Sequence, residues 1–185
     1  MNEMTLPDEI ERPYIINVGL PRVESIDLEY GPIEQEYDDM GSYNHSLVQA
    51  NIAYFLKKYS AHSAFIELSL DASSLDKAIF PNVKDELIPD VCTYPRRSVV
   101  DMDILLMNEM PILVVEVVSP RQGVLSIVQK IQAYFALGVQ SCWLVEPITA
   151  VVRVYHANLP PRTFSAGDLI DTIVDIKAPV TEIFE

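Results

Sequence analysis

Three consecutive blocks decide the fold: PILVVEVVSP (residues 111–120), RQGVLSIVQKIQAYFALGV (121–139) and QSCWLVE (140–146). The first is an apolar, β-branched run between prolines, which is typical of a strand buried on both faces. The second places Ile127, Ile131 and Tyr134 at helical spacing and reaches Gly138, a residue favoured just after a helix C-terminus. The third is again strand-like. The whole stretch therefore predicts a strand, a crossover helix and a second strand.

One residue breaks the apolar run of the first strand, and it is Glu116. A carboxylate inside a buried strand loses its hydration unless a partner replaces it, so Glu116 is expected either to form a structural ion pair or to bind a metal. Lys130 lies on the following helix, which packs back across the sheet in a unit of this kind. The sequence thus predicts that this lysine and Glu116 come close together.

The flanking patterns predict further short elements around this unit. Residues 1–40, with four prolines, indicate an irregular acidic arm with edge strands. The other predicted elements, in chain order, are a helix over 44–59 capped by Ser42 or Asn44, a strand over 64–70 with Ile66, Leu68 and Leu70 on its buried face, strand-like residues at 87–94 interrupted by Pro89-Asp90, a strand over 151–156 and short edge elements over 163–184.

Length and composition limit the possible classes of protein. With 185 residues, 49% of them apolar, the chain can form a core, and we expect a single domain over residues 41–185 after the arm. No stretch is long enough to cross a bilayer and the start is acidic, which favours a cytoplasmic protein. Cys92 and Cys142 are too isolated for a metal or redox motif and are expected to be reduced thiols, while His62 and His156 are expected at the surface.

The formal net charge of −14 argues against a surface that binds nucleic acid non-specifically, because such binding depends on clustered cations. The charge is unevenly distributed. Residues 1–40 contain eleven acids and two arginines, which leaves −5 for the remaining chain. The segment 117–145, with Arg121 and Lys130, contains no acid at all. A divalent metal held by carboxylates would offset part of the remaining negative charge.

Asp90, Glu116 and Lys130 form the constellation with the clearest chemical meaning. Carboxylates on neighbouring strands offer the hard oxygen ligands that Mg²⁺ and Mn²⁺ prefer, and a bound metal activates water and polarises a phosphodiester. A lysine ammonium beside them can orient the attacking water and stabilise charge on the phosphate. Taken singly, Asp90 in a Pro-Asp turn pair and Lys130 on a helix have ordinary structural interpretations.

Several blocks together resemble a known family. IPDV (88–91), PILVVEVVSP (111–120), the K-x3-Y-x3-GV-x3-WLVEP pattern (130–147) and His45 in NHSLVQANIAYFL resemble, in the right order, the Uma2 family, a large group of proteins described as endonucleases. The resemblance spans roughly residues 45–156. It implies a PD-(D/E)xK, restriction-endonuclease-like core, which is a mixed α/β fold with a β-sheet flanked by helices, and a site for Mg²⁺ or Mn²⁺ that acts on DNA.

Carried over by position, the resemblance makes Asp90 and Glu116 the metal ligands, and both act in catalysis with Lys130 as the electrostatic catalyst. His45 and Arg121 become candidates for binding the substrate. For His45, helix capping or packing remains an equal alternative. The chain also departs from the family pattern. Val118 occupies the usual lysine position, Ser126 replaces an aspartate four residues before Lys130, and the first acid of the family has only Glu29 as a poor counterpart.

Two functions from different classes follow from this pattern. The first is a metal-dependent endonuclease, for which a homodimer is a reasonable arrangement because two related strands are cut. The second is an inactive protein of the same fold that serves in binding or assembly, as the acidic surface and Ser126 would suit. A glycosidase with two carboxylates ranks below both, since the chain lacks aromatic sugar platforms. Trp143, Tyr134 and Phe135 are expected in the core.

Overall fold

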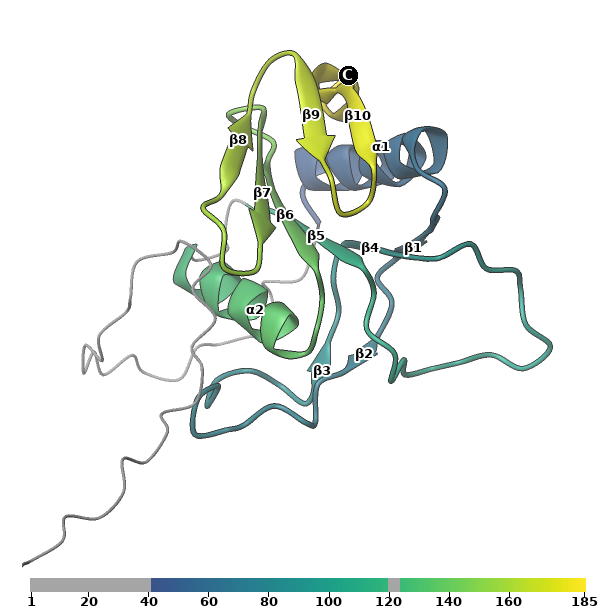
Figure 1. Ribbon diagram of the computed structural model, residues 1–185, viewed down its shortest axis with the longest axis vertical. Coiled ribbons are helices and arrows are strands. Elements are labelled where there is room, and N and C mark those ends of the chain that lie inside the picture. The colour runs from purple at the N-terminus through teal and green to yellow at the C-terminus, as the bar shows by residue number, and fades with distance from the viewer. Residues whose placement is uncertain (1–40, 120–123) are drawn as a thin grey trace, which may run out of the picture.

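The computed structural model describes residues 41–119 and 124–185, in which a six-stranded mixed sheet is flanked by two α-helices (Figure 1). The strand order is β1-β4-β5-β6-β7-β8, and every neighbouring pair is antiparallel except β5 and β6. The elements are α1 (Tyr43–Tyr59), β1 (Ser63–Ile66), β2 (Leu70–Asp71), β3 (Glu86–Leu87), β4 (Val91–Tyr94), β5 (Leu113–Val117), α2 (Val124–Ala136), β6 (Ser141–Glu146), β7 (Val151–His156), β8 (Arg162–Phe164), β9 (Asp168–Asp171), β10 (Ile176–Pro179) and the 3₁₀ helix η1 (Val180–Ile183).

The predicted strand, helix and strand are confirmed as β5, α2 and β6. All five residues of β5 are buried, as expected for a strand covered on both faces. Gly138 ends the helix with φ +101°, and the N–H groups of Gly138 and Val139 donate to the carbonyls of Phe135 and Tyr134. This satisfies the last turn of α2 and directs the chain into β6, which runs parallel to β5 as a crossover requires.

Alternate side chains of the strands pack into two separate cores, one on each face of the sheet. Val115 and Val117 point to the face covered by α1, the β9–β10 hairpin and η1. Val114 points to the other face, where it packs with residues of α2 and of the β2–β3 region. Because side chains alternate along a strand, Glu116 lies on the α2 face, inside the second core. This places the acid directly beneath the crossover helix.

The first helix agrees with its sequence signals. Ser42 caps α1, since its hydroxyl accepts a hydrogen bond from the His45 N–H. Within the described residues, neither α-helix has the length and apolarity needed to cross a membrane. Both cysteines are free and buried, as predicted. The predicted arm at residues 1–40 lies outside the described residues.

The prediction of one strand over residues 64–70 is wrong. The chain forms β1 and β2, separated at Glu67, whose φ of +51° belongs to the left-handed region. A left-handed residue cannot continue the pleat, so the alternation breaks there and Ile66, expected to be buried, is 52% exposed. The interruption predicted at Pro89-Asp90 in the stretch 87–94 is confirmed, since it separates β3 from β4 without a left-handed residue.

The C-terminal residues are more central than the sequence suggested. Only β8 extends the edge of the main sheet, whereas β9 and β10 form a separate hairpin over the α1 face. Val180 and Ile183 of η1 are fully covered in that core. Asn51 of α1 fixes the end of the chain, since its amide donates to the carbonyls of Ile183 and Glu185.

Candidate active site

Glu116 is joined to the crossover helix by two side chains one turn apart on α2. Lys130 Nζ lies 2.9 Å from Glu116 Oε2, and the hydroxyl of Tyr134 donates to Oε1 at 2.8 Å. The Glu116 side chain is only 4% exposed, whereas that of Lys130 is 24% exposed. The ion pair therefore has a buried acid and a cation that reaches solvent. Lys130 Nζ also donates to the Ile88 carbonyl at 3.0 Å.

Asp90 stands beside Glu116, just before β4. In the antiparallel ladder Val91 faces Val115, so the next position outward pairs Asp90 with Glu116. The Asp90 carboxylate accepts the Val117 N–H at Oδ2, at 2.6 Å, and its Oδ1 lies 3.2 Å from Nε2 of His45 on α1. Two helices on opposite faces of the sheet thus meet at these two adjacent acids.

The proximity of the acids changes the proton affinities in the cluster. Burial raises the pKa of Glu116 above its ordinary value, and the Asp90 charge adds to this, while the charge and hydrogen bond of Lys130 oppose it. The hydrogen bond to Asp90 raises the pKa of His45, against the effect of burial. Burial raises the pKa of Tyr134 far above its ordinary value, so its hydroxyl is a permanent donor to Glu116.

The structure brings together four of the five residues that the sequence singled out, namely His45, Asp90, Glu116 and Lys130. The fifth, Arg121, lies outside the described residues. Ser42, not His45, caps α1, and the contact of His45 with a substrate stays a prediction. Its N–H is held by the helix cap and its ring contacts an acid.

Sequence reasoning missed three further residues around these acids, namely Tyr134, Gln49 and Glu67. Tyr134 was expected in the core and is fully buried, but its hydroxyl contacts Glu116. Gln49, one turn after His45 on α1, donates from its amide nitrogen to the Asp90 carbonyl at 3.0 Å and to Glu67 Oε1 at 3.1 Å. A polar residue on the otherwise apolar face of α1 was the signal that could have found Gln49.

The two carboxylates are suited to a divalent metal in the chemistry of their donors. Mg²⁺ is commonly held by one or two carboxylates while it keeps several waters, so Asp90 and Glu116 supply enough protein ligands. Each oxygen already accepts a hydrogen bond, but it retains a second lone pair. Among the described residues, no three His, Cys, Asp or Glu side chains are grouped closely enough to hold a metal by themselves.

A second buried acid, Asp171, lies at the far end of the sheet. Its carboxylate accepts hydrogen bonds from Ser141 Oγ (2.6 Å) and Trp143 Nε1 (2.7 Å) at Oδ2, and from the Ile173 N–H (2.8 Å) at Oδ1, which also lies 3.1 Å from His156 Nε2. The expectation that His156 is an ordinary surface residue is therefore wrong, since its side chain is only 12% exposed.

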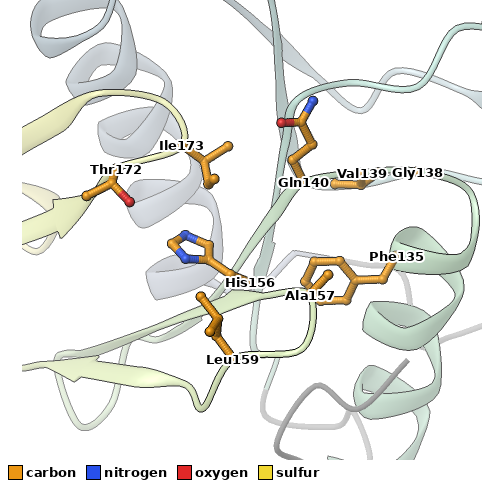
Figure 2. Close-up of a pocket in the computed structure, with 9 residues that line it drawn as sticks. All are labelled: Phe135, Gly138, Val139, Gln140, His156, Ala157, Leu159, Thr172 and Ile173. Carbon is orange, nitrogen blue, oxygen red and sulfur yellow. The ribbon is translucent and has the colours of Figure 1, made fainter. Parts of the chain in front are cut away.

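A shallow cavity of about 450 Å³ opens beside His156, between the end of α2, the start of β6 and the loop after β9 (Figure 2). Its walls are largely apolar. They include Phe135, Val139, Leu159 and Ile173. Because β5 and β6 are parallel and the cavity adjoins the start of β6, it lies at the opposite end of the strands from Glu116.

Comparison with solved structures connects this architecture to a class of proteins. A crystal structure described as a putative nuclease belonging to DUF820, from Anabaena variabilis, aligns with a TM-score of 0.59 over 78% of this chain and 82% of that chain, with 20% sequence identity. At this identity the match shows the fold alone. The protein therefore has the mixed α/β fold of a nuclease-like structure. Comparison with curated proteins gives no match.

The family follows from the sequence itself. A family model named Uma2, described as "Putative restriction endonuclease", matches residues 21–175, which is most of the chain. The protein belongs to the Uma2 family. This confirms the family that the motifs around His45, Asp90, Glu116 and Lys130 predicted.

Proposed function

We propose that this protein is a metal-dependent endonuclease that hydrolyses phosphodiester bonds of DNA. The observation that carries the proposal is the contact of 2.9 Å between Lys130 Nζ and Glu116 Oε2. Glu116 lies on β5, which pairs with β4, the strand that follows Asp90. A buried acid, a second acid one strand away and an ammonium from the crossover helix are the groups that this chemistry needs. Membership of a family described as restriction endonucleases supports the same reaction class.

The proposed roles follow from the contacts of each residue. Asp90 and Glu116 would hold Mg²⁺ or Mn²⁺, which supplies a Lewis acid and a water of lowered pKa when bound. Lys130 lies between the solvent and Glu116, so its ammonium can donate to the attacking water or to a phosphate oxygen while it balances the buried acid.

His45 and Tyr134 support the two acids from either side. Tyr134 fixes the orientation of the Glu116 carboxylate by its hydrogen bond to Oε1. The His45 ring does the same for Asp90, and its raised pKa favours the imidazolium form, which adds positive charge where a DNA phosphate would approach. Arg121 remains a proposed substrate contact on the strength of its position before α2.

A second candidate function is an inactive protein of this fold that binds or assembles with a partner. One observation favours it: each carboxylate oxygen of Asp90 and Glu116 already has a partner within the protein, as in a purely structural network. Ser126, which stands where the resemblance leads one to expect an aspartate, supports the same interpretation.

Metal titration followed by a cleavage assay tests the proposal. Mg²⁺ or Mn²⁺ should raise the melting temperature of the wild type, because a ligand that binds only the folded state stabilises it. The same metals should have no effect on Asp90→Asn, and supercoiled plasmid should be nicked by the wild type and not by Asp90→Asn. The matched control is Asp85→Asn, since Asp85 is an exposed aspartate that pairs with Lys77 at the surface.

Equal residual nicking by the wild type and Asp90→Asn, with no melting shift by either metal, would favour the inactive protein.

The nuclease proposal also extends to the location and the oligomeric state of the protein. We further propose that the protein acts in the cytoplasm, and cleavage of both strands of a duplex is best served by a homodimer. Sedimentation in the presence of a short DNA duplex measures the number of chains.

A further inference from the structure

Gln49 is a buried polar side chain with a specific pair of acceptors. It lies on the face of α1 that packs against the sheet, next to Val48 and Ile52, and is 8% exposed. Its amide nitrogen donates to the main-chain carbonyl of Asp90 and to the carboxylate of Glu67. A buried amide costs free energy unless it is hydrogen-bonded, and here both donor contacts go to residues at the edge of the candidate active site.

Glu67 has an unusual backbone at the same place. In the β1–β4 ladder Ile66 faces Val91, so the next position pairs Glu67 with Asp90, and the Glu67 N–H donates to the Asp90 carbonyl at 3.3 Å. The φ of +51° at Glu67 costs about 1–2 kcal/mol for a residue with a Cβ, so the surrounding contacts must hold it. The conformation turns the chain away after β1 and leaves the Glu67 side chain beside Gln49.

One helix, α1, therefore contacts both polar groups of Asp90, which are its side-chain carboxylate and its main-chain carbonyl. His45 contacts its carboxylate and Gln49 contacts its carbonyl, and these two residues are separated by four positions, so they project from the same face of α1. The opposite helix holds the same segment through the contact of Lys130 with the Ile88 carbonyl. Asp90 follows Pro89 just before β4, and its carbonyl accepts the Gln49 amide at 3.0 Å as well as the longer bond of 3.3 Å from the Glu67 N–H.

We propose that Gln49 is a positioning residue for Asp90, anchored by Glu67, and that it fixes the Asp90 peptide so that the carboxylate stays beside Glu116. This rests on the proposed role of Asp90 as a metal ligand. Glu67 acts through Gln49 rather than on the metal or the DNA. A displacement of about 1 Å at a catalytic group can reduce turnover by about 100-fold, so a residue that fixes such a group has a measurable effect.

Gln49→Met tests the proposal, because methionine keeps the length and flexibility of the side chain but lacks the amide. The matched control is Asn51→Ala. Asn51 lies two residues later on α1 and also donates two side-chain hydrogen bonds, but to Ile183 and Glu185 at the end of the chain. Both variants lose a helix amide, and only Gln49→Met loses the contact with Asp90.

The first readout is the NMR resonance of the Val117 amide proton, recorded without metal or DNA. This N–H donates to Asp90 Oδ2 at 2.6 Å, and a short bond to a carboxylate shifts an amide proton downfield. In Gln49→Met the resonance should move upfield, and in Asn51→Ala it should stay in place. The second readout is plasmid cleavage, for which we expect kcat about tenfold lower in Gln49→Met with KM unchanged.

Variants of Glu67 provide an independent test, because Glu67 is exposed and its replacement leaves the core intact. Glu67→Ala removes the anchor and should reproduce both effects of Gln49→Met. Glu67→Gln keeps an oxygen acceptor for the Gln49 amide and should restore most of the loss. The double variant Gln49→Met, Glu67→Ala should be no worse than either single change, as expected for two residues that act as a unit.

The proposal is overturned if the Val117 resonance is the same in Gln49→Met and the wild type, or if Asn51→Ala moves it equally. It is also overturned if Glu67→Ala leaves the resonance unchanged. These outcomes are distinct from a failure of the nuclease assignment. In that case the wild type would not cleave DNA, while the upfield shift in Gln49→Met would still show that Gln49 positions Asp90.

Discussion

Two buried acids, Glu116 of the main sheet and Asp171 of the β9–β10 hairpin, lie at opposite ends of the main sheet and on its opposite faces. Both are almost inaccessible, at 3% and 0% exposure. Asp171 is surrounded by four fixed hydrogen-bonding groups from β6, β7 and the chain after β9. Glu116 has two partners, and one of them is the ammonium of Lys130, which reaches solvent.

The difference shows how burial of a charge can serve either the fold or chemistry. The groups around Asp171 belong to elements far apart in the chain, so the carboxylate joins the β9–β10 hairpin to the β6–β7 pair. Glu116 joins only α2 to β5, and it stands beside a second acid whose charge adds to the rise in its pKa. An acid that needs a movable cation can exchange that cation for a metal or a substrate, whereas an acid enclosed by fixed dipoles cannot.

The largest expected effect is on folding at Asp171. Asp171→Ala leaves the Trp143 N–H and the Ser141 hydroxyl buried without an acceptor, and each such group costs about 1–3 kcal/mol. We expect a loss of roughly 3–5 kcal/mol in the free energy of unfolding. Urea denaturation measures it. A loss below about 1 kcal/mol would remove the distinction between the two acids.

Glu116→Gln should have the opposite effects, with little loss of stability and a large loss of nicking. Glutamine keeps an acceptor for the Tyr134 hydroxyl and removes a buried charge, while Lys130 can turn to solvent, so the unfolding free energy should change by less than about 1.5 kcal/mol. Nicking should fall by at least about 100-fold, as for the loss of a group that stabilises a transition state. The comparison between the two acids fails if Glu116→Gln unfolds as readily as Asp171→Ala.

Lys130→Met sharpens the comparison by leaving Glu116 buried without its cation. We expect a destabilisation of about 1–3 kcal/mol at neutral pH, because a charged group loses its hydrogen bond. The double variant Glu116→Gln, Lys130→Met should recover most of that loss, as a double-mutant cycle for an interacting pair predicts. If the free-energy losses of the two single variants simply add in the double variant, the two side chains do not interact in solution.

Glu182 supplies a partly exposed reference, with 30% of its side chain accessible, and the smallest effect. Hydrogen bonds from Lys58 and Tyr59 lower its pKa below the ordinary value of 4.5. A carboxyl whose pKa is lower in the folded state stabilises the fold at pH values above its unfolded pKa, and this contribution is lost as the pH falls through the folded value. Glu182→Gln should therefore lower the melting temperature slightly near pH 7, and this difference from the wild type should disappear as the pH falls below about 4.5. A scan of melting temperature against pH measures this.

The sequence by itself determined the central unit and identified Glu116 as the acid buried within it. β5, α2 and β6 follow from local patterns, because a run of β-branched residues, a helical period and a glycine after the helix each act over a few neighbouring residues. Glu116 and Lys130 were found for the same reason, since the right-handed crossover leaves little choice in where the helix packs.

Only the tertiary structure decided which other groups gather at the two buried acids. Gln49 on α1 and Glu67 after β1 meet at Asp90, and the left-handed turn at Glu67 contradicts the strand period that the sequence displayed. For Asp171 only the contact with the Ile173 N–H is local, whereas its partners Ser141, Trp143 and His156 lie 15 to 30 residues away in the chain. Such contacts depend on strand register and on the packing of two cores, which are properties of the whole chain and cannot be read from any short segment.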